Sequence, residues 1–323
     1  MIAILRALTG RYFWITAYLA IGAGVLWPGS PPRPDVVMPI LLGTVLFCTC
    51  LKVSLTDIGR AVAGVAGCRR LALLVVLKLL ILPLPVFLVA WALAGPWAAG
   101  LLLVAAMPAG VTSAVFTDVQ EGDVALALVV ILATSLVAPL TVPPLLAVAA
   151  WSTGAVAEPI PWSALLRQTL FLALMLFLPF SAAQAVRRWW PAWTARHQPR
   201  FTPVALAANA VLLAIATAST RWHWIDRPGT LLWPLGAVSV ASLFFLVCGR
   251  IMRRWAAPPV AIAFTCNAVY MNNGLGMVFA MVFFPDRPDL LLPSLVMAVP
   301  MTAVVFLVRP WLKERTWRPE WPA

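Results

Sequence analysis

Charged residues are scarce in this sequence. Only 11% of its 323 residues are charged, 11 are acidic and two are histidines, whereas a soluble domain carries about 25% charged residues. This shortage excludes a soluble enzyme. The apolar segments also contain no carboxylate pair and no nucleophile with a histidine near it, which a membrane-embedded hydrolase would need. We therefore expect a protein that is not an enzyme and that has no cofactor and no metal site.

Cysteines are also few, and their positions argue against a disulfide framework. Cys48, Cys50, Cys68, Cys248 and Cys266 lie in or beside apolar segments, and their number is odd. Thiols in such places are usually buried packing groups. An exporter of metalloids or oxyanions that uses Cys48, Cys50 and Cys266 is an alternative.

Hydrophobic residues, in contrast, make up 63% of the chain. A helix needs about 20 apolar residues to cross a bilayer, and ten such segments leave little sequence for a soluble domain. The sequence predicts an all-α polytopic membrane protein. The predicted spans are residues 12–27, 37–54, 71–93, 97–119, 122–150, 161–186, 203–220, 230–249, 258–284 and 290–308.

The positive charges lie mainly between these spans and are distributed unevenly. The net charge is +12, and of the 23 Lys and Arg residues, seventeen fall on one side of the predicted membrane and four on the other. Those four are Arg33, Arg221, Arg227 and Arg287. Because Lys and Arg concentrate on the cytoplasmic side, we expect an inner-membrane protein with both termini cytoplasmic. This distribution predicts contact with the lipid bilayer and no nucleic-acid partner.

Ten spans divide into two sets of five, residues 1–155 and 156–323. An odd number of spans in each half gives the halves opposite topology, which is the inverted-repeat plan of many secondary transporters. Such transporters carry broken helices at matching positions in the two halves. The fourth span contains Met107–Ser113, with a proline and a glycine, and the ninth contains Thr265–Leu275, with three asparagines before a glycine. We expect both helices to be broken and the two breaks to meet.

The residues at these breaks form the predicted substrate site. Polar groups in hydrocarbon must find partners, so asparagines here either line a cavity or hydrogen-bond to neighbouring helices. Helix N-termini that face each other carry partial positive charge, which suits an anionic ligand. The predicted substrate-binding residues are Thr112, Ser113, Asn272 and Asn273.

The motifs at and around these positions resemble those of the bile acid:sodium symporter family over most of the chain. Residues 38–51 (MPILLGTVLFCTCL) are similar to the family's PLLLGIIMFGMGL, and residues 108–113 (PAGVTS) to PGGTAS. Residues 122–126 (GDVAL) and 134–139 (TSLVAP) are similar to GDVAL and STLLAP, and residues 265–275 (TCNAVYMNNGL) to TIEVGMQNSGL. The resemblance implies a transporter fold in which transport is coupled to two sodium ions.

The side chains that bind sodium in that family are largely replaced here. The resemblance places the seven ligand positions at Lys78, Ser113, Ala114, Ala127, Ile131, Asn267 and Met271. Only the serine is kept. A hard cation needs several oxygen ligands, which methyl, thioether and ammonium groups do not supply. We therefore expect transport without sodium, while Asn272, which resembles a substrate-contacting residue of the family, is retained.

Lys78 is the most informative of these replacements. It lies about eight residues beyond Arg70, which is roughly 12 Å into an apolar core of about 30 Å. We expect it to be buried beside Asn267 and the ninth-span break, and a lysine at the lipid edge or in a cytoplasmic crevice is the alternative. In the family, one glutamate and two sodium ions give the site a net charge of about +1. A protonated Lys78 opposite the neutral Asn267 gives the same net charge. Lys78, Ser113 and Asn267 therefore form the predicted altered coupling-ion site, in which Lys78 takes the place of the ion.

The predicted function is secondary transport of a small organic anion. Uniport, exchange and proton coupling stay open, as do the substrate, the direction and the oligomeric state, a homo-oligomer included. The alternative from another class is a membrane sensor or partner subunit that keeps the transporter fold without transporting.

Overall fold

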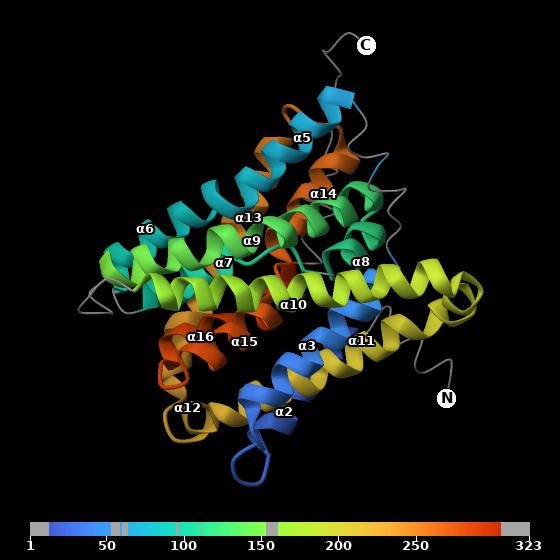
Figure 1. The fold of residues 1–323 in the computed structure, drawn as a ribbon. Coiled ribbons are helices and arrows are strands. Elements are labelled where there is room, and N and C mark those ends of the chain that lie inside the picture. The colour runs from blue at the N-terminus through green and yellow to red at the C-terminus, as the bar shows by residue number, and fades with distance from the viewer. Residues whose placement is uncertain are drawn as a thin grey trace.

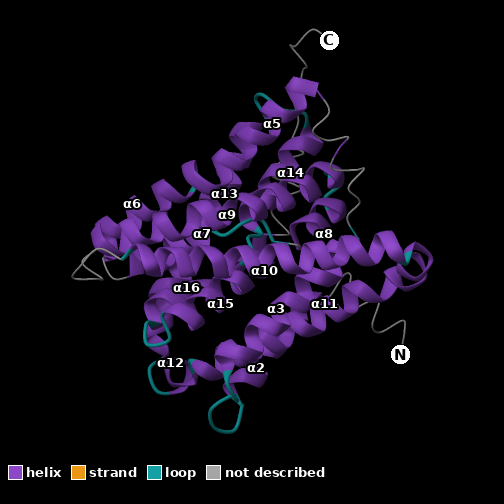
Figure 2. Ribbon diagram, viewed as in Figure 1, coloured by secondary structure: helices purple, strands orange, loops and turns teal. Residues whose placement is uncertain are grey.

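The computed structural model of the protein describes residues 13–52, 59, 64–94, 97–110, 112–152 and 161–304. Within these ranges the regular elements are helices, and no strand occurs (Figure 2). The predicted all-α class is therefore confirmed for the described part of the chain. The predicted boundary between the two halves, at residues 155 and 156, and both termini lie outside the described residues.

The helices follow the predicted spans closely. Five segments are long and apolar enough to cross a membrane, namely Gly67–Leu93, Val124–Ala149, Trp162–Trp189, Pro191–Ser219 and Pro228–Met252. The helices are α2 (Phe13–Val25), α3 (Pro34–Cys50), α5 (Gly64–Val76), α6 (Pro83–Ala94), α7 (Ala98–Ala106), α8 (Thr112–Val119), α9 (Val124–Ser152), α10 (Trp162–Trp189), α11 (Pro191–Ser219), α12 (Arg221–Ile225), α13 (Leu232–Met252), α14 (Pro258–Val269), α15 (Asn273–Phe283) and α16 (Pro288–Val296).

The start of one helix differs most from the prediction. The span predicted at residues 203–220 belongs to α11, which already begins at Pro191. Proline is well tolerated in the first turn of a helix, so the segment rich in tryptophan and arginine continues the helix beyond the apolar stretch. The turn between α10 and α11 is therefore short (Figure 1).

The helices pack in two groups. Helices α2 and α3 lie against α11, and α10 packs on α3, so these four helices adjoin one another (Figure 1). The other group contains the short helices α7, α8, α14, α15 and α16 together with α9 and α13. All nine residues of α7 are buried, as are most residues of α14 and α15. The short helices thus lie at the centre and the long helices around them.

The long outer helices expose large apolar side chains. Leu93 is 75% exposed, Leu140 71% and Trp162 86%. A soluble protein rarely exposes contiguous apolar surface of this kind, whereas in a bilayer it faces lipid. Together with the five long apolar helices, this surface identifies an integral membrane protein.

Candidate functional site

Two helices at the centre of the molecule are interrupted at the predicted positions. Helix α7 ends at Ala106 and α8 begins at Thr112, and α14 ends at Val269 and α15 begins at Asn273. Pro108 explains the first interruption. The residue before a proline avoids the helical conformation, and Met107 indeed adopts φ −58° and ψ 144°.

The two interruptions are hydrogen-bonded to each other. The Gly110 N–H donates to the Tyr270 carbonyl over 2.7 Å, and the Asn272 N–H donates to the Pro108 carbonyl over 2.8 Å. They form a short antiparallel bridge between Ala109 and Met271. Only glycine fits at position 110, because a Cβ atom there would lie 2.8 Å from the Met271 carbonyl oxygen. We call residues 107–110 and 270–272 the crossing.

Side chains from three helices fix this crossing. The Asn272 side chain caps α15, since its Oδ1 accepts a hydrogen bond from the Leu275 N–H over 3.0 Å, as asparagine does at helix N-termini. The Thr134 hydroxyl of α9 accepts from the Ala109 N–H over 3.2 Å. Tyr270 stacks on Phe116 of α8 with ring centroids 4.0 Å apart.

Lys78 binds the first interruption from the side. Its side chain is 2% exposed, and its Nζ donates to the carbonyls of Ala105 and Met107 over 2.8 and 2.9 Å. The last carbonyls of a helix lack main-chain partners, and Pro108 has no N–H to offer. The ammonium therefore satisfies the C-terminus of α7 and lies at the negative end of its dipole.

The residues around Lys78 explain how it reaches this position. It lies in a π-helical turn, Leu77–Ile81, where the Leu82 N–H donates to the Leu77 carbonyl over 2.8 Å. Pro83 follows directly and cannot donate to the preceding turn, so the helix widens there. The lysine lies inside the protein and not at its lipid-facing edge, and its hydrogen bonds go to the fourth-span break and not to Asn267.

Asn267 instead pairs with Ser113. The Ser113 hydroxyl donates to Asn267 Oδ1 over 2.9 Å, and Asn267 Nδ2 donates to the Ala263 carbonyl over 2.9 Å. Both side chains are buried. Two of the three residues of the predicted altered ion site, Ser113 and Asn267, are thus hydrogen-bonded to each other, whereas Lys78 is hydrogen-bonded to main-chain carbonyls.

Beside this pair three of the four remaining replaced ligand positions come together as an apolar cluster, whereas the fourth, Met271, lies at the crossing. Ala114, Ala127 and Ile131 pack against one another with Ala109 and Ala263. Each of the five is buried, between 0% and 8% exposed. Methyl groups therefore fill a region that the resemblance assigns to oxygen ligands.

Three of the four predicted substrate residues line one cavity. Thr112, Asn272 and Asn273 contribute to a cavity of about 80 Å³ beside the crossing, whereas Ser113 does not, because it is engaged with Asn267. The first residues of α8 and α15 both reach this cavity. Its remaining lining residues are Val45, Leu46, Cys48, Thr49, Lys52, Gly110, Val115, Phe201, Thr202, Ala205, Leu206, Asn209 and Met271.

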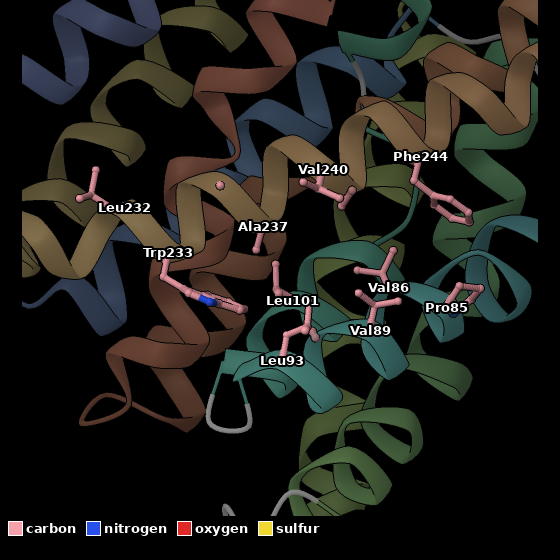
Figure 3. A pocket seen from close by; sticks show the side chains of 13 residues that line it. Pro85, Val86, Val89, Leu93, Leu101, Leu232, Trp233, Ala237, Val240 and Phe244 are labelled. Carbon is pink, nitrogen blue, oxygen red and sulfur yellow. The ribbon is translucent and has the colours of Figure 1, made fainter.

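A second, larger cavity contains none of the predicted site residues. It has a volume of about 470 Å³ and lies between α6 and α13 (Figure 3). Apolar side chains such as Val86, Val240 and Phe244 point into it, and its lining contains no charged side chain. Among the described residues of this lining, the Trp233 indole N–H is the one polar side-chain group, so the cavity offers no counter-charge to an anion.

A comparison with protein families shows which family the chain belongs to. The sequence model of the Sodium Bile acid symporter family matches residues 39–225, which is more than half of the chain. The chain belongs to the sodium bile acid symporter family. The matched region includes Lys78 and the first interruption. Membership of this family indicates a membrane transporter. A search of curated proteins finds no match to the chain.

Several residues of the site were not predicted from the sequence. Lys52, Thr202 and Asn209 line the small cavity, and Thr134 holds the crossing. Lys52 ends an apolar segment and resembles any interfacial lysine, so only its spatial neighbours reveal it. Thr134 lies within the TSLVAP motif that carries the family resemblance, and that motif was the one available signal for it.

Proposed function

We propose that this member of the sodium bile acid symporter family is a sodium-independent secondary transporter of a small organic anion. It would lie in the inner membrane with both termini cytoplasmic and would consist of two inverted five-helix repeats. The protein is not an enzyme and uses no cofactor in this proposal. The two interrupted helices, α7–α8 and α14–α15, would be the matching broken helices of the two repeats.

The apolar cluster beside Ser113 carries the proposal of sodium independence. A sodium ion needs oxygen ligands, and Ala114, Ala127 and Ile131 offer methyl and methylene groups that already pack together. The two polar side chains next to them, Ser113 and Asn267, satisfy each other. Binding sodium would require separating that pair and opening the cluster.

Lys78 supports the same proposal from the other side of the crossing. Its Nζ donates to the carbonyls of Ala105 and Met107, so a basic side chain of the protein itself stands at a position that the resemblance assigns to an ion ligand. The proposed substrate is an anion because the cavity at the crossing lies at the N-termini of α8 and α15, which carry partial positive charge, and because amide and hydroxyl donors line it.

Flux measurements test this function. The purified protein is first screened against a panel of organic acids by thermal unfolding, which its 16 tryptophans report through fluorescence. Uptake of the most stabilising acid into proteoliposomes is then measured in sodium, potassium and choline chloride at equal ionic strength. We expect similar uptake in all three salts. A tenfold dependence on sodium would contradict the proposal, and stabilisation without flux would favour the sensor or partner subunit.

One observation bears on the thiol-based alternative. Cys48 lines the cavity at the crossing, whereas Cys50 and Cys266 do not, so the three thiols proposed for metalloid binding do not share that cavity. Unchanged arsenite tolerance of cells that express the protein is the expected result.

A further inference from the structure

The end of α3 places one lysine in the cavity at the crossing. Two carbonyls at this end already have side-chain partners. Gln184 Nε2 donates to the Cys50 carbonyl over 3.2 Å, and Arg187 donates to the Leu51 carbonyl over 2.6 Å. Lys52, the next residue, is therefore not needed as a cap. Its Nζ instead donates to the Thr202 hydroxyl of α11 over 2.9 Å, at the wall of the cavity.

Lys52 is the one charged side chain among the described residues that line this cavity. The described lining contains no carboxylate, and its hydroxyl and amide side chains are Thr49, Thr112, Thr202, Asn209, Asn272 and Asn273. Within the described residues the ammonium donates to a neutral hydroxyl, that of Thr202. A partly buried charge that lacks a counter-ion is costly, so the cavity is prepared for a ligand that brings one negative charge.

The walls of the cavity come from both helix groups. Lys52 and Thr202 belong to the group of α3 and α11, whereas Thr112, Asn272 and Asn273 belong to the interrupted helices. A ligand whose negative group lies on Lys52 would therefore reach donors of the crossing with its other polar atoms. Val45, Leu46 and Val115 supply apolar contact for the remainder.

We infer that Lys52 binds the negative group of the substrate and that the cavity selects small monocarboxylates. This inference rests on the proposed transport of an organic anion and specifies its class. One cation and a volume of about 80 Å³ match one carboxylate on a short carbon chain. A second carboxylate would meet only neutral amide and hydroxyl donors, because the described lining holds no second cation to pair with it. Lys78 has a separate role, because its ammonium is bound to main-chain carbonyls.

Matched ligands test the inference. Thermal stabilisation and competition for uptake are measured with acetate, propionate and butyrate, with their amides, and with malonate and succinate. The parent protein should prefer each monocarboxylate over its amide and over the dicarboxylates. Lys52→Gln should reduce the preference for acid over amide by about tenfold or more, the scale of one lost hydrogen bond to a charged group. Lys52→Arg should retain most of it.

The control is a neighbouring cation that does not line the cavity. Arg187→Gln removes the cap on Leu51 and should lower the unfolding temperature without changing the ratio of acid to amide. If Lys52→Gln keeps the parent ratio, Lys52 is a structural residue and the inference is wrong, although transport of another anion would stand. If the parent protein binds none of the probes and transports no organic acid, both the inference and the proposed function fail.

Discussion

At the scale of single residues, the environment of each lysine decides its role. Lys78 and Lys52 both lie beside apolar sequence, yet one is bound to the carbonyls of Ala105 and Met107 and the other to a hydroxyl at a cavity wall. Main-chain carbonyls at a helix end cannot move away from their ligand without unwinding the helix. Lys78 is thus a fixed part of the crossing, whereas Lys52 can exchange its partner for a ligand.

Replacing Lys78 with methionine tests its structural role. Lys78→Met keeps the volume but leaves two buried carbonyls without donors, and each unsatisfied group costs about 1–3 kcal/mol. We expect a clear fall in the unfolding temperature and weaker binding of the stabilising acid, measured by tryptophan fluorescence. Lys52→Met is the matched control and should change stability less, because its ammonium is only partly buried. Parent-like stability and transport of Lys78→Met would contradict the assigned contacts.

The sequence predicted which residues belong to the site better than it predicted their hydrogen-bond partners. The depth of Lys78 in its span follows from the rise of a helix and predicted burial. The hydrogen-bond partner of Lys78 could not be predicted from the sequence. Ala105, Met107 and Asn267 all belong to the interrupted helices, and only the direction of the lysine side chain distinguishes them. Lys52 was missed because Thr202 lies 150 residues away in sequence, and no local pattern encodes that contact.

At the scale of helices, proline and asparagine predicted the interruptions with good accuracy. Pro108 restricts the residue before it, and Asn272 caps the helix that follows it, so both breaks depend on local chemistry. The close packing between α13 and α14 depends on long-range contact instead. A Cβ on Gly249 of α13 would overlap the hydroxyl of Thr265 and lie 2.8 Å from its Cβ atom.

This close approach gives a matched pair of substitutions in one helix. Gly249→Ala should destabilise the protein by about 1–3 kcal/mol, the usual cost of overpacking. Gly236→Ala, in the same helix with no atom within 4 Å of the new Cβ, should be neutral or stabilising by up to about 1 kcal/mol. Adding Thr265→Ala to Gly249→Ala should recover part of the lost stability, since it removes the hydroxyl and the methyl group but keeps the Cβ atom at 2.8 Å. Equal effects of the two glycine substitutions in thermal unfolding would disprove the packing of α13 on α14.

At the scale of the whole molecule, the number of membrane spans decides the architecture. Five described segments are long enough to span a bilayer by themselves, while each half of α7–α8 and α14–α15 is short. An inverted repeat requires that each interrupted pair of helices counts as one membrane span, because only then does each half contain an odd number of spans. The charge distribution predicts the same topology by an independent principle.

Accessibility of single cysteines tests that count. Cys68 is exposed at the very start of the segment Gly67–Leu93, before the third predicted span. Gly229, exposed beyond α12, has open space for a side chain. Five predicted spans separate these positions when α7–α8 counts as one, so they should face opposite sides. With the other cysteines replaced, a membrane-impermeant maleimide should label Gly229→Cys in intact cells and Cys68 only after permeabilisation. Labelling of both from the same side would give an even number of membrane spans between them, which is incompatible with an inverted repeat built on a broken fourth span.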